Sequence, residues 1–83
     1  WERGCRPCEL LDPKINQMAA DFKGRIVFAK VCIDDNPETM IKYGVERTPT
    51  LLIFNNSNMV YKHVGNYPID DLKHIILTVL HMR

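Results

Sequence analysis

This 83-residue sequence has almost no net charge and no long apolar run. The first feature argues against a protein that binds polyanions, and the second against a protein that spans a membrane. The 11 basic residues are balanced by 10 acidic residues, which leaves a net charge of +1. This balance offers no electrostatic case for binding nucleic acid or an anionic membrane. The longest apolar run, Ile75 to Leu80 with Thr78 inside it, is far too short to span a bilayer. We therefore expect neither nucleic acid nor a membrane as a partner.

Cysteine is also rare, and its odd count of 3 does not suit a scaffold built from disulfides. The length indicates one domain, and no internal repeat, low-complexity tract or linker divides it. Hydrophobic residues make up 46% of the chain and charged residues 25%. These values are ordinary for a globular protein and argue against disorder.

Hydrophobic periodicity predicts the element order α-β-α-β-β-α. Apolar residues at spacings of three and four indicate a helix, whereas an almost continuous apolar run indicates a strand covered on both faces. Pro37 and Pro68 suit helix starts, and residues 55–58 form a turn signal between two strands. The expected elements are a helix over Cys5–Phe22, a strand over Arg25–Ile33, a short helix from Pro37 to about Tyr43, strands over Thr50–Phe54 and Met59–Val64, and a helix from Pro68 to Leu80.

The spacing of Cys5 and Cys8 indicates thiol–disulfide chemistry. Thiol exchange requires a thiolate nucleophile and a second thiol close enough to resolve the mixed disulfide that forms. At a helix N-terminus, unpaired N–H groups and the helix dipole stabilise the Cys5 thiolate, and the first turn brings Cys8 beside it. Pro7 suits that first turn, and the positive charge of Arg6 favours the thiolate further. We predict that Cys5 is the nucleophile and Cys8 the resolving cysteine.

Other roles for the cysteines and histidines stay open. Cys5 and Cys8 could form half of a zinc site, but zinc needs two more ligands. The remaining cysteine and the three histidines form no recognisable second pair, so we expect no metal. Cys32 fits a packed position in its strand, with a regulatory thiol as the alternative. We expect His63 to alternate outward in its strand and to be solvated.

The chain resembles the thioredoxin family over essentially its whole length. The resemblance rests on motifs that fall in the family's order and spacing. They are Trp1 four residues before Cys5, Pro13 in the following helix, the Phe28–Asp34 strand, Asn36-Pro37, Tyr43-Gly44-Val45 before Thr48-Pro49-Thr50, and Val64-Gly65. The resemblance implies a thioredoxin-like α/β fold, with a mixed central sheet flanked by helices.

This resemblance also implies roles for several residues. Trp1 packs beside the active site, Pro49 is cis opposite the disulfide, and the backbone of Thr48 pairs with an extended substrate, with Gly65 nearby. Lys30 aids deprotonation of Cys8. The expected function is a thiol–disulfide oxidoreductase with no cofactor other than its own Cys5–Cys8 disulfide. Its partners are protein disulfides and a reductase or other electron donor, and its expected compartment is the cytoplasm.

Some departures from the family pattern shape these expectations. Gly4 stands where the family usually has a second tryptophan, and Arg6 stands where it has a glycine, so we expect a specialised enzyme. The family also has a β-α-β segment before the tryptophan, whose last strand lies between those matching Arg25–Ile33 and Thr50–Phe54. We therefore expect residues 1–83 to be an N-terminally incomplete domain. A thioredoxin-like binding module in a larger protein, with reduced catalysis, is the alternative.

Overall fold

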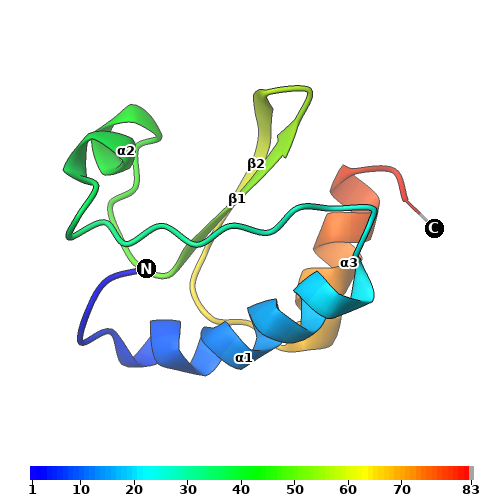
Figure 1. Ribbon diagram of the computed structural model, residues 1–83, viewed down its shortest axis with the longest axis horizontal. Coiled ribbons are helices and arrows are strands. Elements are labelled where there is room, and N and C mark those ends of the chain that lie inside the picture. The colour runs from blue at the N-terminus through cyan, green and yellow to red at the C-terminus, as the bar shows by residue number, and fades with distance from the viewer. Residues whose placement is uncertain (83) are drawn as a thin grey trace.

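A computed structural model describes residues 1–82 of the chain. Three helices and two strands form in this part of the chain, and Figure 1 shows the two strands as a hairpin with α2 on one side, α3 on the other and α1 below them. The hairpin is antiparallel, as the sequence predicts. The elements are α1 (Arg6–Asp21), α2 (Pro37–Lys42), β1 (Thr50–Asn55), β2 (Asn58–Val64) and α3 (Ile69–Val79).

Helix α1 begins one residue after the predicted start. Cys5 is the N-cap residue, with an extended backbone, and its sulfur accepts a hydrogen bond from the backbone N–H of Cys8. Proline follows within the first turn, where a missing N–H costs nothing. The helix continues through Pro13 and ends before Gly24, whose φ of +82° is a conformation that glycine adopts readily. The position of α1 therefore fixes Cys5 at a helix N-terminus.

The hairpin turn joins β1 to β2 through Asn56 and Ser57. Both residues have positive φ values, of 52° and 68°. Two-residue turns with positive φ at both positions match the right-handed twist of the flanking strands, and asparagine tolerates this region better than most residues. The turn signal in the sequence is thus confirmed, and the register pairs Thr50 with Val64.

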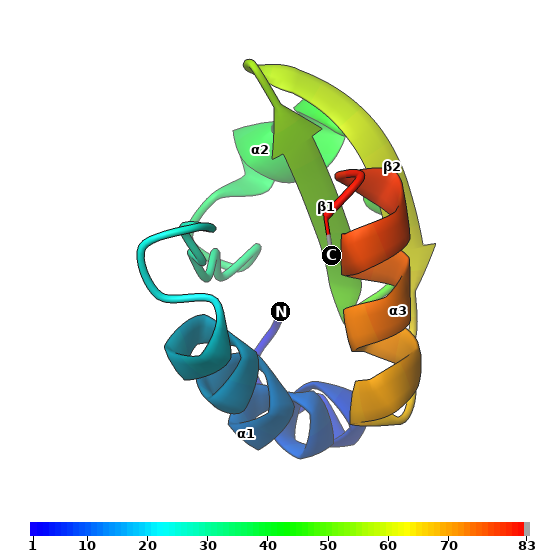
Figure 2. The same ribbon diagram turned by 90° about the vertical axis from the view of Figure 1, so that its right-hand side faces the viewer.

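The core lies where α1 and α3 pack on the hairpin. Figure 2 shows α3 running alongside the two strands, with α1 crossing near its start. Met18 of α1 and Leu72 of α3 are fully buried, and Ile53 of β1 packs with them. Tyr43, after the end of α2, contacts Phe54 edge-on at 5.3 Å. Apolar residues that recur at helical spacing in α1 and α3 therefore form the core together with Ile53 of β1.

The prediction of a strand over Arg25–Ile33 is wrong. Residues 26–32 form neither helix nor strand, and the sheet within residues 1–82 contains β1 and β2 alone. An apolar run reports burial, whereas a strand also requires a neighbour to complete its hydrogen bonds. A cavity of about 410 Å³ separates segment 26–31 from β1, so β1 is not that neighbour. The described part of the chain accordingly has an antiparallel sheet and not the expected mixed one.

The prediction that His63 is exposed is also wrong, because its side chain is only 9% exposed. His63 pairs across the hairpin with Leu51, which packs against the core. Cross-strand partners share one side of a sheet, so His63 shares the buried side. Tyr67 covers the imidazole edge-on at 4.1 Å. Its Nε2 has no hydrogen-bond partner in the described part of the chain.

Candidate active site

Cys5 and Cys8 form a disulfide at the N-terminus of α1. Their Cα atoms lie 5.2 Å apart, within the usual span of such a bond. The backbone N–H of Cys8 donates to the sulfur of Cys5 at 3.2 Å. Cys8 is buried, at 7% exposure, whereas Cys5 is partly exposed. An incoming disulfide therefore reaches Cys5 more easily than Cys8, and the N–H of Cys8 points at the sulfur that would carry negative charge.

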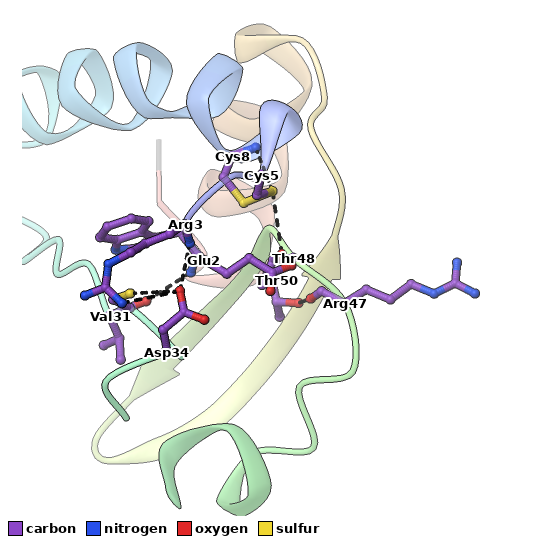
Figure 3. The surroundings of a disulfide bond; sticks show 11 residues. Glu2, Arg3, Cys5, Cys8, Val31, Asp34, Arg47, Thr48 and Thr50 are labelled. Atoms are coloured by element: carbon purple, nitrogen blue, oxygen red, sulfur yellow. Dashed lines mark hydrogen bonds and ion pairs between the residues drawn. A yellow bond between two sulfur atoms is a disulfide. The ribbon is translucent and has the colours of Figure 1, made fainter. Parts of the chain in front are cut away.

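The loop before β1 lies next to this disulfide, as Figure 3 shows. The Thr48–Pro49 peptide bond is cis, as the resemblance implies. The Thr48 hydroxyl lies 3.6 Å from the Cys5 sulfur. Pro49 is buried, and its carbonyl accepts a hydrogen bond from the backbone N–H of Gly65 at 2.8 Å. The fold therefore brings Thr48 to the disulfide, although more than forty residues separate it from Cys5, and it joins Gly65 to Pro49 in the same loop region.

The backbone of Thr48 is available for a partner. No hydrogen bond to another residue in the range 1–82 involves its N–H or its carbonyl. The neighbouring residues are held instead, since the Thr50 hydroxyl donates to the carbonyl of Arg47 at 2.5 Å. An extended peptide that passed the disulfide could pair with these free groups in the manner of an added strand.

Glu2 is a site residue that sequence reasoning missed. Its carboxylate accepts a hydrogen bond from the Thr48 hydroxyl at 2.5 Å, and both side chains are partly buried. Figure 3 shows the Glu2 side chain extending toward Thr48. Nothing in the C-x-x-C pattern signals this contact, because the two residues lie 46 positions apart. Only the position of Glu2, three residues before Cys5, could have suggested it.

The chain before Cys5 is hydrogen-bonded to residues 31–34. Trp1 donates through its terminal amino group to the Val31 carbonyl at 3.0 Å, and its own carbonyl accepts from the N–H of Ile33 at 2.9 Å. The backbone N–H of Arg3 donates to Asp34 at 2.8 Å. This hydrogen bond holds the pKa of Asp34 below its ordinary value. The Asp35 carboxylate binds the Arg3 guanidinium and raises its pKa.

The other predicted side chains lie near the disulfide with partners of their own. Arg6 forms an exposed ion pair with Glu9 at 3.2 Å, so part of its charge is compensated. Lys30 binds Asp12 of α1 at 2.5 Å, and no bond to Cys8 is present among residues 1–82. Lys30 and Cys8 do line the same cavity. Pro7 is exposed within the first turn, and Trp1 lines the cavity but is itself exposed, at 45%.

Cys32 is buried and is not part of a disulfide within the described residues. Its sulfur lies 3.6 Å from the Asp34 carboxylate. No group of three or more histidine, cysteine or acidic side chains within residues 1–82 is placed to hold a metal ion. No helix formed by these residues combines the length and apolar character needed to cross a bilayer.

The sequence is similar to a family of known proteins. The family model described as thioredoxin matches residues 1–78. The chain is 36% identical over 76 residues to the thioredoxin of Staphylococcus aureus strain Mu50 and to that of strain MW2. Each match covers 92% of this chain and 73% of the relative. The matched region includes the disulfide, the loop before β1 and most of α3.

Proposed function

Because this chain belongs to the thioredoxin family, we propose that it is a thiol–disulfide oxidoreductase that acts on protein disulfides through Cys5 and Cys8. The observation that carries the proposal is the disulfide at the N-terminus of α1, with the N–H of Cys8 directed at the Cys5 sulfur. The resemblance in sequence and the similar relatives support the same chemistry. The disulfide also favours catalysis over the alternative of a binding module with reduced activity.

The proposed cycle starts from the reduced pair. The Cys5 thiolate attacks one sulfur of a substrate disulfide, a mixed disulfide forms, and the other substrate sulfur leaves as a thiolate. The Cys8 thiolate then attacks Cys5, which breaks the mixed bond and releases the second substrate thiolate. Two electrons have moved to the substrate, whose thiolates take protons from water, and the Cys5–Cys8 disulfide remains. A reductase or other thiol donor must return two electrons to close the cycle.

Substrate binding is proposed for the loop before β1. The unpaired backbone of Thr48 and the buried Pro49 lie beside Cys5, with Gly65 bonded to Pro49. A peptide pairing with Thr48 would present its disulfide to the more exposed cysteine. Pro7 and Arg6 form the outer surface of the motif, and Trp1 lies at its cavity side. A reducing compartment such as the cytoplasm, which we propose, would keep the pair in its reactive form.

Deprotonation of Cys8 is easier where its thiolate is stabilised, and we propose that Lys30 contributes to this stabilisation. Lys30 and its partner Asp12 line the cavity into which Cys8 is buried. The proposed effect is electrostatic, because a positive charge near a buried thiol favours its thiolate. A direct bond is not required for this role.

We also propose that a further strand completes a mixed sheet by lying in the cavity between segment 26–31 and β1. The support is the hydrogen bonding of Trp1, which donates to Val31 and accepts from Ile33. In a parallel ladder, a residue of one strand hydrogen bonds to two residues of the other strand that lie two positions apart, as Trp1 does here. A strand in the register set by Trp1 would supply partners for the free backbone of both segments. Residues 1–83 would then belong to one thioredoxin-like domain.

The experiment that tests the function is turnover of a protein disulfide. The protein is mixed with insulin and a limiting amount of dithiothreitol, and reduction of the insulin disulfides is followed by turbidity. We expect acceleration by the wild-type chain and none by Cys5→Ser. Cys8→Ser should instead trap a mixed disulfide with the substrate through Cys5, visible on a non-reducing gel. Equal rates for wild type and Cys5→Ser would refute the proposal, and Cys32→Ser serves as the matched control that leaves turnover intact.

A further inference from the structure

We infer that Glu2 raises the pKa of the reduced Cys5 thiol through the hydroxyl of Thr48, and so limits how much of this nucleophile is ionised. This inference rests on the proposed function, since it concerns the same cysteine. The Thr48 oxygen lies 2.5 Å from the Glu2 carboxylate and 3.6 Å from the Cys5 sulfur. The three side chains therefore form a continuous chain from a carboxylate to the reactive sulfur, which Figure 3 shows beneath the disulfide.

The direction of the effect follows from counting protons. A hydroxyl group has one proton to donate. An ionised carboxylate can only accept, and a hydroxyl bound to it forms a short and strong hydrogen bond. The Thr48 proton is therefore directed to Glu2, and the oxygen lone pairs are left for Cys5. A protonated Cys5 can donate to those lone pairs, but a thiolate cannot receive a proton from them.

Two contributions then oppose ionisation of Cys5. The thiolate loses a hydrogen bond that the thiol can make, and it lies near a second negative charge. The helix N-terminus acts in the opposite direction through the N–H of Cys8. The reactivity of Cys5 is thus a balance between α1, which favours the thiolate, and Glu2, which favours the thiol.

The other charges around the disulfide have different partners. Arg6 is paired with Glu9 on α1, and Arg3 is paired with Asp35. Arg47 is exposed, and Figure 3 shows its side chain extending away from the disulfide. Among the described residues, Glu2 is the carboxylate that hydrogen bonds connect to Cys5. Removing it should therefore change Cys5 more than removing any neighbouring charge.

The test is the pH dependence of alkylation of Cys5. Reduced protein is treated with iodoacetamide between pH 4 and 10, and modification at Cys5 is quantified by mass spectrometry. In Glu2→Ala the Thr48 hydroxyl is free to donate to the thiolate, and we expect the apparent pKa of Cys5 to fall by about one unit. In Glu2→Gln the amide oxygen still accepts but the charge is gone, so we expect a smaller fall of about half a unit. Glu46→Gln, an exposed carboxylate two residues before Thr48, is the matched control and should leave the value unchanged.

A double variant separates this route from a general effect of Glu2. Thr48→Val removes the hydroxyl, so adding Glu2→Ala to it should shift the pKa by less than half of what Glu2→Ala does alone. The inference is overturned if Glu2→Ala leaves the pKa of Cys5 unchanged or raises it. It is also overturned if the full shift persists in the Thr48→Val background. The proposed function fails separately, if wild-type Cys5 titrates like a free thiol near about pH 8.5 and insulin is not reduced.

Discussion

Replacing Leu72 with alanine should destabilise the protein by about 3 kcal/mol, because this side chain lies where three elements meet. Leu72 of α3 is 1% exposed and belongs to the core cluster with Met18 of α1 and Ile53 of β1. Buried leucines replaced by alanine lose about 2.7–5.0 kcal/mol, depending on how far the surroundings collapse into the space. The lower part of this range applies here, since Ile76, one turn further along α3, lines an open cavity that leaves the helix room to relax.

The assay is urea unfolding of the oxidised protein, followed by far-ultraviolet circular dichroism. Domains have stabilities of about 0.05–0.15 kcal/mol per residue, so this chain should have about 4–12 kcal/mol in total. With a urea dependence of about 1 kcal/mol per molar, the midpoint should fall by about 3 M. Leu10→Ala is the matched control, because Leu10 of α1 is 44% exposed, and it should cost less than about 0.5 kcal/mol. A midpoint drop below about 1 M with an unchanged slope would show that Leu72 is not in a close-packed core.

The remaining predictions concern Ser57 in the hairpin turn, Asp34 beside Arg3, and Arg6 in the C-x-x-C motif. Ser57→Gly should stabilise the protein by about 0.5–1 kcal/mol in the same urea assay, since glycine adopts the observed positive φ without strain. A loss of stability in this variant would contradict the turn geometry. The pKa of Asp34 is lowered by the Arg3 N–H, so its stabilising effect is present above the ordinary value of 3.8 and is lost as pH falls through the lower folded value. The stability gap between wild type and Asp34→Asn should accordingly shrink below about pH 4, and a constant gap would refute this. Arg6→Ala should change the pKa of Cys5 by less than about half a unit, because the exposed guanidinium is already paired with Glu9; a larger shift in the alkylation profile would contradict that pairing.

The helices and the hairpin could be predicted because their signals are local. Leu11, Met18 and Phe22 repeat at helical spacing and are buried as expected. The turn at Asn56 is likewise set by the conformations that neighbouring residues favour. The motif also predicted Cys5 at a helix N-terminus, and in the structure Cys5 is the N-cap residue of α1.

The failures concern relations between distant segments. The apolar run over Arg25–Ile33 predicted burial in a sheet, but pairing depends on a neighbour that no pattern within the run can report. The alternation of polar and apolar residues around His63 divides the strand into two faces, but it does not tell which face the helix α3 covers. Glu2 reaches Thr48 across 46 positions, so only the folded chain brings that carboxylate near Cys5.

The separation between the two halves of the site has a consequence for partly unfolded molecules. Cys5 and Cys8 are adjacent within one helical turn, whereas Thr48 reaches Cys5 only where the loop before β1 docks on the N-terminus of α1. A chain that retained α1 but lost this docking would keep a reactive pair of thiols and lose the surface that selects a peptide. Small disulfide reagents should therefore continue to be reduced at urea concentrations where proteins no longer are. The protein would become less discriminating before it became inert.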